Sequence, residues 1–453
     1  CANTEGLNNT AIGHLALRKN TTADNNTAVG MSALTANTTG EKLVAIGALA
    51  LDANTTADDN TAVGFCSLST NTTGCRNVAM GCGSLKTNLT GDRNTAVGHI
   101  AMEGNTSADN NTAVGYAALN VNSTGALNVA VGANALAANT TADFNTAIGA
   151  CSMLTNITGE ENTAVGFNSL KTSTVSNNTA FGSQSLRGTT TGADNTAVGR
   201  DAMKANTTGA SNTAVGMNAL VANTTGSSNT SIGKCSLFTN ISGGANIAIG
   251  INALRLNTAS NNLAVGHCAM DANSSGTENT AFGFVALNKN TTGDFNTALG
   301  RGTLNANTTA DNNTAVGHCA LFANTTGTQN TAVGVCSMLN TNTGGNSNSA
   351  FGMFSLKETT TGDNNTAMGY QAGCTLTTGT NNVMIGNVAG TNTLAIAHTT
   401  TQSNRIILGN SSSTNAFIKI DWTVGSDVRD KINFETIPHG LNFVNQLNPV
   451  SFQ

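Results

Sequence analysis

Small, apolar and amide residues return every seventeen positions along most of this chain. A glycine preceded by a small and then an apolar residue recurs 23 times from Gly13 to Gly386, with occasional one-residue slips. The unit reads approximately N-T-A-V-G-x-x-A-L-x-x-N-T-T-G-x-x. A short period held over many copies is typical of stacked coils that each contact only their neighbours. We therefore predict an all-β fold, a parallel β-solenoid or β-roll of about 23 coils, over residues 1–390.

Counted from its asparagine, the unit predicts a short strand around positions two to four. In one copy, Thr27 and Val29 share one strand face and Ala28 takes the other, because side chains alternate along a strand. Both faces exclude charge, which is typical of a strand covered on two sides. We expect the valine, with the leucine or methionine of the second apolar segment, to fill the coil's interior. We expect the alanine face to lie against another chain, since a larger residue there would push neighbouring backbones apart.

The interior of a single coil is thin. Burial of one valine and one leucine contributes about 3–6 kcal/mol. Ordering the residues of the coil costs more, at about 1 kcal/mol or more for each residue. Backbone hydrogen bonds between coils offset part of that difference. We therefore predict an obligate oligomer.

The glycine and asparagine columns are predicted to shape the corners. The repeat glycines, such as Gly30, Gly64 and Gly115, are expected to turn the chain through a positive φ that a Cβ would resist. The first position is asparagine in 22 of 23 copies, with Leu43 the exception. Asparagines at both corners can stack their amides from coil to coil. This prediction covers the first-position residues Asn26, Asn60 and Asn111 and the asparagine of each Asn-Thr-Thr-Gly turn.

Length changes fall in the second corner. Residues 173–177 form a shortened corner and residues 341–348 a lengthened one. Because length variation belongs at the surface, we expect the Thr-Thr-Gly corner to face outward.

Charge and hydropathy exclude several classes of function. Charged residues make up 9% of the chain and the net charge is −5, with no basic stripe of the kind that nucleic acid requires. No stretch approaches the roughly 18 apolar residues of a membrane span. We therefore expect neither a nucleic-acid nor a membrane partner.

The cysteines are expected to be free. Six of the ten stand two residues after the repeat glycine, where other copies carry mostly small or apolar residues. That interchange is typical of buried structural thiols, and it favours assembly in a reducing cytoplasm. The alternative is an occasional bridge between the adjacent coils that hold Cys319 and Cys336.

Residue types that bind cofactors or perform catalysis are sparse in the repeats. His267 and His318 are three coils apart, too far for one chain to bind a metal ion with both. Three chains could bring together three copies of His318, but we expect packed or exposed histidines, no metal site and no cofactor. We find no paired carboxylates in register, and the aromatic residues, such as Tyr116 and Tyr370, look scattered.

The repeats resemble two kinds of trimeric fibre. The Ala-Val-Gly unit followed by Ala-Leu resembles the head repeats of trimeric autotransporter adhesins, and resembles more closely the N-T-A-V-G arrays of phage tail fibres. The adhesin resemblance implies a parallel β-roll that associates in threes. The resemblance of the repeats to both kinds of fibre covers residues 9–390.

The C-terminal segment resembles a second family. It runs from Asn404-Arg405-Ile406-Ile407-Leu408-Gly409-Asn410 through Phe417-Ile418-Lys419-Ile420 and Trp422 to Ser426-Asp427-Val428-Arg429-Asp430-Lys431, and then to His439-Gly440-Leu441 and Leu447-Asn448-Pro449-Val450-Ser451-Phe452. This resembles the start of the self-cleaving intramolecular chaperone of endosialidase-type tail spikes and fibres.

That resemblance implies a cleavage site at Ser426 and Asp427. It assigns the nucleophile to Ser426 and the general base to Lys431. A serine needs a neighbouring base, and a partly desolvated lysine can serve. The alternative is a polar turn that opens a helix, with Ser426 as its N-cap. Only 27 residues follow Ser426, so we expect a truncated chaperone with a short helical start.

Together these observations predict a structural fibre protein without enzymatic activity, apart from possible self-cleavage at Ser426. We expect a shaft at 1–390, a β-rich connector at 391–425 and the chaperone start at 426–453. The leading hypothesis is a homotrimeric phage or virus tail fibre, assembled in the host cytoplasm, that attaches to a glycan or protein receptor on the host cell. The alternatives are an extracellular cell-surface adhesin and, less favoured, an ice-binding solenoid.

Overall fold

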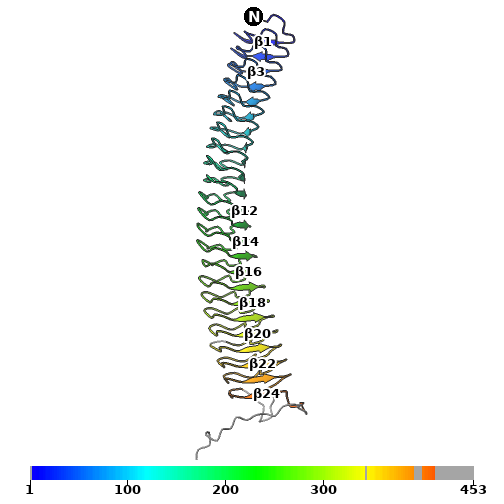
Figure 1. Ribbon diagram of the computed structural model, residues 1–453, viewed down its shortest axis with the longest axis vertical. Helices are drawn as coiled ribbons and strands as arrows, with labels where there is room; N and C mark the ends of the chain where they lie inside the picture. The colour runs from blue at the N-terminus through cyan, green and yellow to red at the C-terminus, as the bar shows by residue number, and fades with distance from the viewer. Residues whose placement is uncertain (1–2, 342–343, 392–399, 414–453) are drawn as a thin grey trace, which may run out of the picture. The chain divides into compact units, whose positions relative to one another are not determined.

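The computed structural model describes residues 3–341, 344–391 and 400–413. Contacts divide the chain into two units, Cys1–Asn410 and Ser411–Gln453. The first unit is a parallel β-solenoid of about 22 turns with a 17-residue period, and none of its described residues is helical. Figure 1 shows its coils stacked one on the next from β1 to β24. The predicted all-β solenoid is confirmed, whereas the expected helical start at 426–453 lies outside the described residues.

Each coil contributes one strand of three residues, and each strand pairs in parallel with the next along the chain. Register is kept even where a coil is one residue short or long, as at Thr163↔Thr179 and Thr331↔Ser349. The slips therefore lie in the corners, as predicted. The strands are β1 (Thr10–Ile12), β2 (Thr27–Val29), β3 (Val44–Ile46), β4 (Thr61–Val63), β5 (Val78–Met80), β6 (Thr95–Val97), β7 (Thr112–Val114), β8 (Val129–Val131), β9 (Thr146–Ile148), β10 (Thr163–Val165), β11 (Thr179–Phe181), β12 (Thr196–Val198), β13 (Thr213–Val215), β14 (Thr230–Ile232), β15 (Ile247–Ile249), β16 (Leu263–Val265), β17 (Thr280–Phe282), β18 (Thr297–Leu299), β19 (Thr314–Val316), β20 (Thr331–Val333), β21 (Ser349–Phe351), β22 (Thr366–Met368), β23 (Val383–Ile385) and β24 (Ile406–Leu408).

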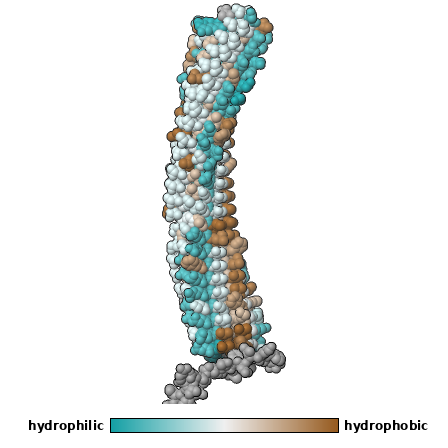
Figure 2. All heavy atoms as spheres, in the orientation of Figure 1, coloured by the Kyte–Doolittle hydropathy of each residue, from teal (hydrophilic) through white to brown (hydrophobic). Residues whose placement is uncertain are grey.

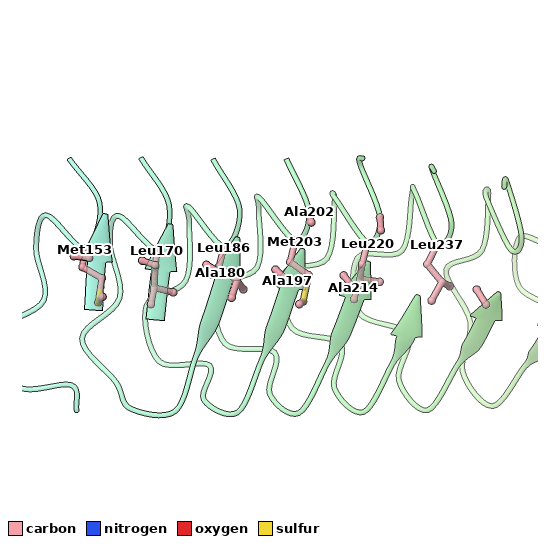
Figure 3. Packing of buried hydrophobic residues seen from close by; sticks show 14 of the residues in the cluster. Met153, Leu170, Ala180, Leu186, Ala197, Ala202, Met203, Ala214, Leu220 and Leu237 are labelled. Atoms are coloured by element: carbon pink, nitrogen blue, oxygen red, sulfur yellow. The ribbon is translucent and has the colours of Figure 1, made fainter. Parts of the chain in front are cut away.

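The interior of the solenoid holds the alanine face of the strands, not the valine face. Ala197 and Ala214 are fully buried, and the leucine or methionine column packs beside them, as Met203 and Leu220 show in Figure 3. Val198, on the opposite face of β12, is 38% exposed. Two predictions are therefore wrong: the alanines do not face another chain, and the valines do not fill the core. Alternation gives two faces but does not say which one the chain will curl around, and a narrow coil has room only for the smaller residue.

One departure from the alanine column shows how tightly the interior is filled. Met384 takes the place of alanine in β23 and is fully buried. In the preceding coil the leucine column holds Gly373, and a Cβ on that glycine would come within 2.6 Å of the Met384 Cε. The glycine makes room for the methionine, so the interior keeps its total volume.

The repeat glycine adopts a conformation that other residues resist, as predicted. Gly30, Gly64 and Gly115 have φ of +139°, +136° and +135°. A Cβ on Gly64 would meet the carbonyl oxygen of Gly81, in the next coil, at 2.6 Å. The column of glycines therefore lets successive backbones approach closely at this corner.

Two ladders of buried asparagines connect the coils. At the first position Asn60 accepts a bond from the backbone N–H of Asn77 in the next coil (2.8 Å) and donates to Gly74 O within its own coil (2.8 Å). Asn26 and Asn111 make the equivalent pairs of bonds. At the outer corner the amides bond one another directly, since Asn54 donates to Asn37 Oδ1 (3.0 Å). The predicted amide stacking is confirmed at the outer corner. At the first position the three amides named above bond backbone groups, and direct amide–amide bonds appear in later coils, where Asn162 donates to Asn145 Oδ1 (3.2 Å).

Each coil contains left-handed residues that the sequence did not predict, in the turn after the repeat glycine and again just before the next coil begins. In the coil of β2, Ser32, Leu34 and Lys42 have φ of 61°, 51° and 56°, and equivalent residues repeat this pattern along the solenoid. The seventh position is glycine or asparagine in several coils, such as Gly83 and Asn134. Both residue types tolerate positive φ better than others.

Candidate functional site

The residues predicted to cleave the chain cannot be placed. Ser426, Asp427 and Lys431 all lie outside the described residues. The predicted structural residues of the glycine and asparagine columns are placed as expected, and they maintain the coils rather than forming a binding site. The side chains available for function therefore lie on the outside of the solenoid.

An apolar stripe on the outside of the solenoid is made by the third residue of each described strand, from Ile12 in β1 to Leu408 in β24. We call it the outer apolar stripe. None of these residues is buried, and Phe282 and Met368 are 52% and 48% exposed. Figure 2 shows apolar side chains gathered along one edge of the solenoid, most continuously over the C-terminal coils. An exposed apolar strip of this length is typical of an interaction surface.

Rings and cations stack in the column just after the repeat glycine. His99 lies on Tyr116 with ring centroids 5.7 Å apart, and His267 lies on Phe284 at 5.5 Å. The Arg301 guanidinium is 5.8 Å from the Phe284 ring, and its Nη1 is 3.2 Å from His318 Nε2. The aromatic residues that look scattered in the sequence are thus brought together by the period. Phe284 lies between His267 of the preceding coil and Arg301 of the next, so this ring offers mainly its edge to a ligand.

The described cysteines are free thiols, as expected, but they are not fully buried. Cys66, Cys268 and Cys319 are half-buried, and Cys82 is exposed. Partial burial raises the pKa of the Cys268 and Cys319 thiols, which keeps them protonated and unreactive at neutral pH. Their column is the seventh position, where φ is positive. Residue choice there is shaped by backbone conformation as well as by burial, which explains the half-buried asparagines in the same column, such as Asn134 and Asn252.

Carboxylates do lie in register on adjacent coils, contrary to the sequence-based expectation. Asp92 and Asp109 occupy the same position in successive coils, and so do Asp294 and Asp311. Each accepts a bond from the backbone N–H of the preceding coil, as Asp109 does from Asp92 N at 2.7 Å. The carboxylates are therefore occupied as caps between coils, and this arrangement gives no acid–base pair.

Other classes of site find no support in the part of the chain that the structure describes. No group of three or more histidine, cysteine, aspartate or glutamate side chains there could hold a metal ion. The same residues include no helix long and apolar enough to cross a membrane. No protein-family model matches the chain, and no curated protein matches it.

Proposed function

We propose that this chain is the shaft of a homotrimeric tail fibre, which holds a virion to its host cell and is released from a C-terminal self-cleaving chaperone. The observation that carries the proposal is the outer apolar stripe. It follows the whole described solenoid at one apolar side chain per coil, or about 4.8 Å per step.

The stripe favours a second copy of the chain as its partner. A partner that covers it must be equally long and must present apolar groups at the same step. Another copy of this solenoid meets both conditions. The number three is supported by the resemblance of the repeats to trimeric adhesin heads and tail fibres. The interface we now propose is the valine face, in place of the alanine face.

The interface can be tested by charge substitution. Val198→Asp, Val215→Asp and Ile232→Asp change three successive stripe residues that are 37–38% exposed. Three carboxylates facing apolar surface should dissociate or prevent the trimer, because burying unpaired charge is costly. The matched control is Thr208→Asp, Thr225→Asp and Ser242→Asp, on exposed corners of the same coils. Size measurements should show smaller particles for the first variant only. Intact trimers in both variants would contradict the proposed interface.

The self-cleavage part of the proposal rests on the C-terminal resemblance. In it, the Ser426 hydroxyl attacks a neighbouring peptide carbonyl carbon while Lys431 takes up the hydroxyl proton. The peptide C–N bond then breaks, its nitrogen leaves with that proton, and water hydrolyses the ester that remains on the serine. A chain extended through a complete chaperone should release a fragment, and Ser426→Ala should abolish the release. Lys431→Arg keeps the charge but should also abolish it, since arginine does not act as a base. Fragment release that survives Ser426→Ala would exclude Ser426 as the nucleophile.

A further inference from the structure

A cluster of positive charge lies on the coils of β10, β11 and β12. Lys171, Arg187 and Lys204 all occupy the tenth position of their units, so they follow one another up the solenoid at about one coil step, near 4.8 Å. Arg200 stands beside Lys204 on the coil of β12 and shares its carboxylate partner. We call these four residues the cationic patch. The column of its three stacked members is separate from the outer apolar stripe.

The charges of this patch are only partly neutralised. Asp201 lies 3.1 Å from both Arg200 Nε and Lys204 Nζ. Among the described residues, no carboxylate lies within 4.0 Å of Lys171 or Arg187. Arg187 donates only a 3.3 Å bond to Gln184 Oε1. The patch therefore presents a local excess of positive charge on a chain whose net charge is negative.

Elsewhere in the same column, lysine and arginine are mostly paired with acids. Lys86 meets Glu103 at 3.7 Å, and Arg255 meets Asp271 through two bonds of 2.7 and 3.1 Å. Lys357 lies 3.0 Å from Glu358. Lys171 and Arg187 differ from these three residues, because their charges are available to bind an anion from outside.

A hollow accompanies the unpaired charge. It has a volume of about 490 Å³ and lies beside Arg187 and Lys204, where Gly188 contributes no side chain. That volume is within the usual range for small-ligand sites, about 300–1,000 Å³. Its lining residues are Thr172, Arg187, Gly188, Lys204, Ala205 and Val221.

A second hollow on the solenoid provides a comparison. It measures about 290 Å³ and is lined by Phe354, Lys357, Glu358 and their neighbours. The Asn340 amide and the Lys357 ammonium hold the pKa of Glu358 below its usual value, so this carboxylate stays charged beside the lysine. The charges of Lys357 and Glu358 therefore neutralise each other in that hollow. Among the described residues, the hollow at the cationic patch has no such carboxylate partner for Arg187.

We propose that the hollow at the cationic patch binds an acidic saccharide, with a sugar ring against Gly188 and its carboxylate or sulfate group on Arg187 and its lysine neighbours. Arginine suits such groups because its guanidinium can donate two parallel bonds. Nucleic acid fits less well. The hollow has no aromatic ring on which a base could stack, and three coils are too short a track for many phosphates.

The proposal concerns the surface of one solenoid and does not depend on how many chains assemble. It is tested by titrating the full chain with a sulfated heparin hexasaccharide, an oligogalacturonate that carries only carboxylates, and a neutral cello-oligosaccharide. Calorimetry at 0.15 M salt should show binding of at least one acidic probe and none of the neutral one. Which acidic probe binds tells sulfate from carboxylate.

Two variants distinguish binding in a shaped site from general electrostatic attraction to the protein. Lys171→Gln with Arg187→Gln leaves the Arg200–Asp201–Lys204 group intact and should weaken binding roughly tenfold. Gly188→Val fills the hollow without changing charge and should weaken binding similarly. A Cβ at this position would lie 2.9 Å from the backbone oxygen of Lys204, so the coil must shift locally. Val121, in the equivalent place of another coil, shows that the repeat accommodates valine there. The control, Lys86→Gln with Lys357→Gln, removes as much charge elsewhere and should change affinity less than about twofold.

Several results would overturn the proposal. These are no binding of either acidic probe, equal loss of binding in the control, or unchanged binding after Gly188→Val. Tighter binding of a single-stranded DNA oligomer than of both saccharides would point to a nucleic-acid ligand instead. Circular dichroism of each variant checks that the coils remain folded.

Discussion

Neighbouring residues of one short strand meet opposite environments in this molecule. The middle residue of β2 to β23 is buried and is alanine in all but two of these strands, whereas the third residue is exposed or half-buried and varies among valine, isoleucine, leucine, methionine and phenylalanine. The inner column must fit a fixed, narrow space, so its size is constrained. The outer column is apolar but free in size. That difference indicates that the inside is packed by the coil itself and that the outside is available to a partner.

The largest expected effect comes from placing a charge on the inner or on the outer face of the strand, because only the inner face is packed by the coil itself. Ala214→Asp puts an unpaired carboxylate into the closed interior of β13 and should cost on the order of 4 kcal/mol or more of stability, with local loss of coils. Val215→Asp, one residue later, should leave the coils folded and weaken assembly alone. Thermal unfolding and particle size, measured on both variants, check this. Equal unfolding of the two variants would contradict the assignment of inside and outside.

The methionine–glycine exchange in the interior allows a sharper test of size constraint. Met384→Ala should leave a cavity and cost about 2–4 kcal/mol, and Gly373→Leu alone should overpack the site and cost about 1–3 kcal/mol. Combined, the two changes recreate the ordinary repeat and should recover most of both losses. A double-mutant cycle of unfolding free energies measures this coupling. Additive losses would show that the two side chains do not share one space.

A smaller effect is expected where the asparagine ladder is interrupted. Leu43 replaces the first-position asparagine, so this coil lacks the bonds that Asn60 makes to Asn77 N and Gly74 O one coil later. Leu43→Asn should restore both bonds and stabilise the chain by about 1 kcal/mol. Asn60→Leu should do the reverse, because the buried N–H of Asn77 loses its acceptor, whereas Gly74 O still accepts a bond from Asn71 Nδ2 (2.8 Å). Hydrogen exchange of the flanking coils checks both. A destabilising Leu43→Asn would show that the leucine packs better than the amide bonds.

The sequence was sufficient for the period, the strand position, the glycine corners and the asparagine ladders. Each follows from a residue type with a specific backbone or hydrogen-bonding property, such as the positive φ of Gly64. It was not sufficient to decide which strand face is inside, because alternation is the same for both assignments. The left-handed residues at Ser32 and Leu34 were also missed, since neither residue type signals that conformation.

Surface arrangements were missed for a different reason. The Asp92–Asp109 register and the His267–Phe284–Arg301–His318 stack become visible only when the chain is aligned by its own period, column by column. The cationic patch is of the same kind, because Lys171, Arg187 and Lys204 are dispersed in sequence and stacked in space. All three features are encoded in the sequence as columns of equivalent repeat positions.

We propose that further copies of the same chain cover the outer apolar stripe. Multi-angle light scattering of the purified, folded protein tests it most directly, since it gives molar mass independently of the elongated form of a solenoid. We expect three times the chain mass of 45.6 kDa, unchanged on dilution through the micromolar range. A folded, stable particle of 45.6 kDa would contradict it.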